Sequence, residues 1–120
     1  MSKKLLVVDD VPEIRQLLCA AFAASGWQVQ TAPDAATARE MKRAARFDLV
    51  LSDVDMPGES GCELVRWIVR NYPATPTILM SGRAAPCEEC PLIPHCPIVQ
   101  KPFKLTQLIE TVNKTAAKVS

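Results

Sequence analysis

The stretch Leu49-Val50-Leu51-Ser52-Asp53 is a short apolar run that ends at a carboxylate. Three other runs have the same form: one ends at Asp9-Asp10, one at Ser81 and one at Lys101. Short apolar runs bounded by polar residues are typical of buried parallel strands. Because the carboxyl ends of parallel strands lie along one edge of a sheet, these polar side chains are expected to gather there.

Helical periodicity separates most of these runs. The expected strands span 3–8, 27–32, 48–52, 77–80 and 98–100, and amphipathic helices follow the first three and the last. Such alternation predicts βαβ units and a parallel sheet covered on both faces. We therefore expect an α/β fold, with residues 1–120 forming a single domain. The sheet is predicted to be flavodoxin-like, doubly wound and five-stranded, in the order 2-1-3-4-5.

One segment departs from this alternation. Between Ser81 and Lys101, prolines stand at positions 86, 91, 94 and 97. A proline inside a helix costs about 3 kcal/mol, because it removes a hydrogen bond and clashes with the preceding turn. Helix 4 of this fold, between the last two strands, is therefore predicted to be shortened or missing.

Composition narrows the function classes. Formal net charge is +1, from 14 basic and 13 acidic residues, so no strong field attracts nucleic acid or an anionic membrane. No apolar run approaches the roughly 20 residues of a membrane helix, and no signal peptide is recognisable. These features predict a cytoplasmic protein. In that compartment, the five cysteines are expected to be free thiols or metal ligands before disulfides.

The strand-end carboxylates indicate a metal site. On neighbouring strands, the carboxylates of Asp10 and Asp53 are expected to lie roughly 5 Å apart, where they repel by about 3 kcal/mol. Mg²⁺ is the natural counter-ion, since it prefers a few carboxylates with water and a phosphate. Lys101 and Ser81 are placed to bind the same anion.

A carboxylate beside a divalent metal, a lysine and a hydroxyl suits covalent phosphoryl transfer, in which the carboxylate attacks phosphorus in line. The simpler alternative is that the aspartates are helix caps, and it would suffice for Asp9 or Asp10 alone. Independent caps need not converge on one place, however, so the whole set favours a phosphoacceptor.

Four motifs, in order along nearly all of the chain, resemble the receiver domain of bacterial two-component response regulators of the chemotaxis type. They are Val7-Val8-Asp9-Asp10, Leu51-Ser52-Asp53-Val54-Asp55-Met56-Pro57 with Gly61, Ser81-Gly82, and Lys101-Pro102-Phe103. The resemblance implies that Asp53 accepts a phosphoryl group from a sensor histidine kinase or a phosphotransfer protein. It also implies that Lys101 and Ser81 bind the phosphoryl oxygens.

The same resemblance implies a set of Mg²⁺ ligands. Asp10 would coordinate the ion directly and Asp9 largely through water, while Asp53 and the carbonyl of Asp55 would complete the protein's share. Asp55 is also placed to pair with Arg83 at the mouth of the pocket, where the pair would affect the lifetime of the phosphoaspartate.

The sequence departs from the family at the usual output face. Ile98 stands where an aromatic switch residue is common, so we expect a phosphorylation-induced change that needs no aromatic rotamer. The chain would signal by altered binding to an output protein that the sequence does not name, with no direct nucleic-acid contact and no catalysis beyond its own phosphorylation and dephosphorylation. A homodimer is compatible with the sequence.

A second function class rests on the cysteine-rich loop 87–96. Cys87, Cys90 and His95 have the spacing of the first three ligands of a zinc knuckle, but Gln100 stands at the fourth position and Cys96 is a poor substitute. A disulfide within the loop is another outcome. The alternative reading is thus a phosphorylation-independent interaction, redox-sensing or metal-sensing module. A haloacid-dehalogenase-type hydrolase, suggested by the two carboxylates of Asp53-Val54-Asp55, requires more chain and a different motif position.

Overall fold

The computed structural model of the protein describes residues 3–82 and 97–117. Five parallel strands form one sheet in the order β2-β1-β3-β4-β5. The predicted fold class and strand order are confirmed. The strands are β1 (Lys4–Val8), β2 (Gln28–Ala32), β3 (Leu49–Asp53), β4 (Thr77–Ser81) and β5 (Ile98–Gln100).

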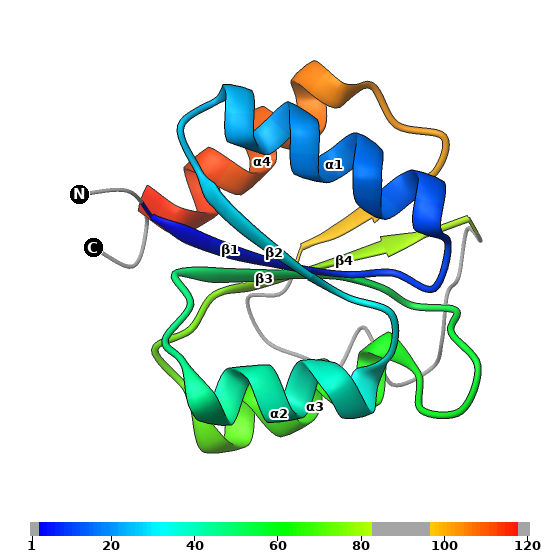
Figure 1. Ribbon diagram of the computed structural model, residues 1–120, viewed down its shortest axis with the longest axis vertical. Helices are drawn as coiled ribbons and strands as arrows, with labels where there is room; N and C mark the ends of the chain where they lie inside the picture. Colours follow the sequence, from blue (N-terminus) through cyan, green and yellow to red (C-terminus); the bar gives the residue numbers. More distant parts are fainter. Residues whose placement is uncertain (1–2, 83–96, 118–120) are drawn as a thin grey trace.

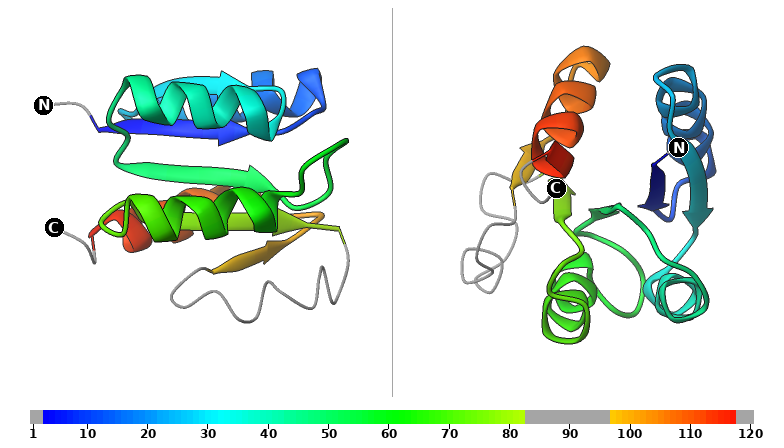
Figure 2. Two further views of the ribbon diagram at one scale, coloured as in Figure 1. Left: turned by 90° about the horizontal axis from the view of Figure 1, so that it is seen from below. Right: turned by 90° about the vertical axis from the view of Figure 1, so that its left-hand side faces the viewer.

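Four helices among the described residues cover the two faces of the sheet (Figures 1 and 2). The helices α1 and α4 lie on one face, and α2 and α3 lie on the other. Their bounds are α1 (Pro12–Ala24), α2 (Ala35–Ala44), α3 (Gly61–Asn71) and α4 (Leu105–Ala117). The segment predicted to lack a full helix, together with Cys87, Cys90, His95 and Cys96, lies outside the described residues. Within those residues, no helix is both long and apolar enough to cross a bilayer.

Alternate side chains of β1 enter the two halves of the core. Leu5 and Val7 belong to the cluster that packs under α1 and α4, whereas Leu6 and Val8 belong to the cluster under α2 and α3. All four are fully buried. A strand that is apolar on both faces requires helices on both sides of the sheet, which explains why the central runs are continuous rather than alternating.

Local signals set the ends of the helices on both faces of the sheet. The Asp34 carboxylate caps α2 by accepting a hydrogen bond of 2.7 Å from the Thr37 amide, and the Ser60 hydroxyl caps α3 in the same way. Pro12 opens α1, and Gly26 follows that helix with a φ of 94°, a conformation that side chains disfavour.

The cysteines depart from the expectation of free thiols. Cys62, buried at the start of α3, is disulfide-bonded, so for this residue the prediction was wrong. Cys19 on α1 is the free cysteine among the described residues.

Candidate phosphoacceptor site

Parallel register brings the acidic residues to one edge of the sheet. Val8 of β1 pairs with Ser52 of β3, so the residues that follow each of them emerge side by side. Asp53 is the last residue of β3 rather than the first beyond it, one residue later than predicted. The aspartates therefore converge because two strands end at the same level.

Three carboxylates form a compact cluster. Asp9, Asp10 and Asp53 each offer an oxygen within 4.8 Å of the others. Asp9 is fully buried and Asp53 is 5% exposed. The spacing agrees with the separation expected from neighbouring strands, and the cluster needs a cation to balance its charge.

Asp9 is held by the chain that follows it. Its Oδ1 accepts a hydrogen bond of 2.9 Å from the Val11 amide, and its carbonyl accepts one of 2.7 Å from Arg15 Nη1. No side chain caps the start of α1, so the helix-cap alternative fails for Asp10 there. Oδ2 of Asp9 is buried without a hydrogen-bond partner among the described residues. An anionic oxygen left in this way fits a metal ligand.

Lys101 provides the positive charge of the site. Its Nζ lies 3.2 Å from Oδ1 of Asp53 and 3.5 Å from Oδ2 of Asp9, the second distance being an ion pair rather than a hydrogen bond. Its backbone amide donates to the Ser81 carbonyl at 2.6 Å, which joins the ends of β4 and β5. The Lys101 side chain thus reaches Asp53 across β4, and its binding to an anion held there stays a prediction.

Gly61 allows the chain to pass closely behind Asp53. A Cβ at position 61 would lie 2.0 Å from the carbonyl oxygen of Asp53, too close for any other residue. The Gly61 amide donates to the Val54 carbonyl at 3.0 Å, and the Ser52 hydroxyl donates to the Asp53 carbonyl at 3.0 Å. These contacts fix the backbone around Asp53.

Burial and neighbouring charges shift the pKa of the Asp53 carboxyl. Burial, the largest influence, raises its pKa above the usual 3.8. The positive charge of Lys101 opposes this rise, and the negative charges of Asp9 and Asp10 add to it. Lys101 therefore favours the ionised form of this carboxyl, which is the form that can act as a nucleophile.

For the other predicted site residues, Ser81, Asp55 and Arg83, the structure describes only part of the expected arrangement. Ser81 is fully buried at the end of β4, next to the site, while Asp55 is exposed beyond β3. The carboxylate of Asp55 is not one of the three clustered groups, and the predicted role of its carbonyl remains a prediction. The Asp55–Arg83 pair falls outside the described residues because Arg83 does.

Two contacts near the site had no motif that pointed to them. One is the Arg15 hydrogen bond to Asp9. The other is the ion pair between Arg39 of α2 and Glu59, which ties the β3–α3 loop to the neighbouring helix. The two residues of the first contact are six positions apart in the sequence, and those of the second are twenty apart. Neither spacing matches the periodicity of a helix or a strand.

Comparisons with known proteins agree with this geometry. A family model for the response regulator receiver domain matches residues 5–113. Protein PetR of Rhodobacter capsulatus is 35% identical over 120 residues, which cover 96% of this chain and 49% of PetR. The DNA-binding transcriptional regulator NtrC of Rhizobium meliloti is 33% identical over 119 residues, 95% of this chain and 24% of NtrC. The chain thus spans less than half the length of each of these two curated relatives.

Several solved structures with the same fold share more than 25% identity with this chain. The chemotaxis response regulator CheY4 of Vibrio cholerae has a TM-score of 0.88 at 30% identity, covering 96% of this chain and 99% of that one. TrrA of Thermotoga maritima, solved in complex with Mg(2+)-BeF, has a TM-score of 0.86 at 31% identity, covering 94% and 98%.

A doubly wound parallel sheet with a carboxylate cluster and a lysine at its carboxyl edge defines a domain of two-component signalling. The chain belongs to the response regulator receiver domain family. Its function class is accordingly phosphoacceptor signalling, and receiver domains as a family are phosphoacceptors rather than enzymes acting on separate substrates.

Proposed function

We propose that this protein accepts a phosphoryl group on Asp53 from the phosphohistidine of a sensor kinase or phosphotransfer protein, in a Mg²⁺-dependent reaction. The observation that carries the proposal is the position of the Asp53 carboxylate, which lies 3.2 Å from Lys101 and shares a cluster with Asp9 and Asp10. A carboxylate that only stabilised the fold would not need two acidic neighbours, because they repel it.

The donor set fits Mg²⁺. Asp9, Asp10 and Asp53 would hold the ion with the carbonyl of Asp55. This role is supported by Oδ2 of Asp9, which is buried, pairs with Lys101 and accepts no hydrogen bond among the described residues. When bound, Mg²⁺ supplies charge neutralisation on the oxygens of the transferring phosphoryl group.

The chain's own groups perform the transfer. A carboxylate oxygen of Asp53 forms a bond to phosphorus as the phosphorus–nitrogen bond of the donor breaks, and the imidazole leaves with that electron pair. Lys101 then exchanges its ion pair with the carboxylate for one with a phosphoryl oxygen, and the Ser81 hydroxyl donates to another. Lys101 therefore stays engaged before and after the reaction, with a different partner.

Signalling would follow from this exchange at the β4–β5 edge. The amide of Lys101 donates to the carbonyl of Ser81, so movement of either residue is transmitted to the other strand. Ile98 of β5 is 38% exposed on that edge and lies in a surface that a partner can contact. We infer that phosphorylation alters binding of an output protein here without an aromatic switch. The proposal applies to a monomer and to a homodimer alike.

The test is labelling by acetyl phosphate, which requires no cognate kinase. Purified protein is incubated with acetyl phosphate and MgCl₂, and intact mass is recorded. We expect one added phosphoryl group in the native protein. No group should be added when EDTA removes Mg²⁺ before the reaction, and none should be added to Asp53→Asn. Equal labelling of Asp53→Asn would overturn the proposal.

One observation favours a redox role as a second candidate. Cys62 is disulfide-bonded and directly follows Gly61, which abuts the Asp53 carbonyl. Reduction of that disulfide would release the start of α3 beside the phosphoacceptor. If labelling is unchanged by dithiothreitol and by Cys62→Ser, the redox alternative is excluded.

A further inference from the structure

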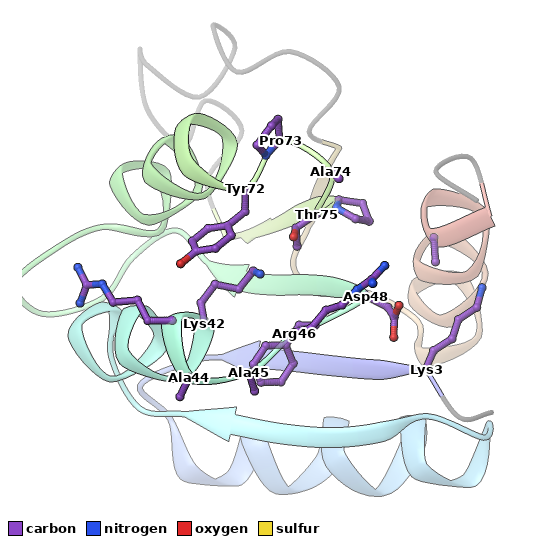
Figure 3. A pocket seen from close by; sticks show the side chains of 14 residues that line it. Lys3, Lys42, Ala44, Ala45, Arg46, Asp48, Tyr72, Pro73, Ala74 and Thr75 are labelled. Carbon is purple, nitrogen blue, oxygen red and sulfur yellow. The ribbon is translucent and has the colours of Figure 1, made fainter.

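A cavity of about 710 Å³ opens at the edge of the sheet opposite to Asp53, where the strands begin (Figure 3). Its walls are the end of α2, the connection into β3 and the connection from α3 into β4. Cavities of roughly 300–1,000 Å³ are typical of small-molecule sites. The phosphoacceptor chemistry makes no use of this cavity.

The lining of this cavity is strongly cationic. Four basic residues and one acidic residue line it, and the carboxylate of the acidic residue already accepts a hydrogen bond of 2.8 Å from the Lys4 amide. The charged lining residues are Lys3, Lys42, Arg43, Arg46 and Asp48. Across the whole chain the basic excess is a single charge, so the excess inside the cavity is a local feature. It gives the cavity affinity for anions.

Lys42 is a buried lysine with no counter-ion among the described residues. The residue is 4% exposed, and its Nζ lies 4.0 Å from the centroid of the Tyr72 ring. Within residues 3–82 and 97–117, no carboxylate forms an ion pair with it. Burial, followed by the nearby charge of Arg46, lowers the pKa of Lys42. A buried cation of this kind is costly unless an anion pairs with it.

The rest of the wall is apolar. Ala45, Pro73 and Ala74 contribute hydrocarbon surface beside the cations, and in Figure 3 the Lys42 side chain extends between Tyr72 and the strands. Such a mixture selects an organic anion over a simple inorganic ion, since the apolar surface must also be covered.

We propose that this cavity binds a small organic anion with two or more negative charges, in which phosphate or carboxylate groups pair with Lys42 and Arg46. The hydrocarbon part of the ligand lies against Pro73 and Ala74. This site is separate from the Asp53 site and does not depend on the proposed phosphorylation.

The first test maps binding by amide chemical shifts in metal-free buffer. ¹⁵N-labelled protein is titrated with citrate as the carboxylate probe and with glycerol 2-phosphate as the phosphate probe, against NaCl at matched ionic strength. We expect saturable shifts confined to residues 42–48 and 72–76 with at least one probe, and the stronger probe identifies the preferred anionic group. Non-saturable shifts, shifts reproduced by NaCl, or shifts centred on Asp53 would overturn the proposal.

Matched variants complete the test. Lys42→Met and the exposed Arg46→Gln each remove one positive charge from the cavity and should raise the dissociation constant about tenfold. Lys104→Gln removes the same charge at the opposite edge of the sheet and should leave it unchanged. Because Arg46 is exposed, its variant keeps the test decisive even if Lys42→Met folds poorly. Unchanged affinity in Arg46→Gln would contradict the assignment.

Discussion

The ammonium of Lys101 lies 3.2 Å from Oδ1 of Asp53, although Asp53 ends β3, Lys101 follows β5, and β4 lies between these two strands. The lysine stem spans this gap, and the Lys101 side chain is 26% exposed beside two carboxylates that are almost fully buried. One positive charge therefore balances part of the cluster before reaction. The same charge is in place to receive a phosphoryl oxygen.

Lys101→Met should lower the rate of labelling by acetyl phosphate by about 10²–10³-fold, since it removes the positive charge from the transferring oxygens. The rate is measured by intact mass at fixed MgCl₂ concentration. Lys104→Met is the matched control: it removes an exposed lysine three residues further on and should label at the normal rate. Equal rates in both variants would mean that Lys101 takes no part in the transfer.

Asp53→Asn should increase the free energy of unfolding of the metal-free protein by roughly 1 kcal/mol, because the repulsion from Asp9 and Asp10 outweighs the attraction to one lysine. The same change removes a metal ligand, so MgCl₂ should raise the melting temperature of the native protein and have little effect on the variant. Urea unfolding and thermal melts with and without MgCl₂ measure both effects. If MgCl₂ does not change the melting temperature of the native protein, the metal site is contradicted.

Gly61→Ala should lower the free energy of unfolding by about 1–3 kcal/mol or more. The new Cβ would lie 2.0 Å from the Asp53 carbonyl oxygen, so the backbone must move. The displaced Asp53 should also label more slowly. Gly82→Ala is the control, because a Cβ at position 82 meets nothing within 4 Å. Urea unfolding and acetyl phosphate labelling on both variants distinguish a steric effect from the general preference for glycine in loops.

Asp34→Asn should change the pH dependence of stability at the acidic end. Hydrogen bonds from the amide and hydroxyl of Thr37 lower the pKa of Asp34 below its usual 3.8 in the folded state. The carboxylate thus contributes stability that is fully present above 3.8 and is lost as pH falls through the lower, folded-state pKa. Asparagine caps at any pH, so the melting temperature of the variant should fall less steeply with acid. Parallel acid profiles for the two proteins would contradict this account.

The site was predictable where it depends on parallel strands ending together. Asp9, Asp53 and Lys101 each end or directly follow an apolar run, and the register of β1 with β3 makes their convergence a consequence of strand order. The precise end of β3 was not predictable, because a buried aspartate can extend a strand or follow it with the same local sequence.

Other features depend on contacts between distant residues. The close packing of Gly61 on Asp53 arises from the path of the β3–α3 loop, and the anion cavity combines residues from position 3 to position 116. The disulfide of Cys62 also had no local signal, because cysteine spacing does not determine pairing. These features depend on tertiary contacts that the local sequence does not specify.

The most direct test of the central claim is to locate the phosphoryl group. Protein labelled with acetyl phosphate and Mg²⁺ is reduced with borohydride, which converts an acyl phosphate to the alcohol, and the modified peptide is sequenced by mass spectrometry. The account predicts a single modification, at Asp53, in the native protein. Modification at Asp9, Asp10 or Asp55 instead, or none at all under these conditions, would contradict it.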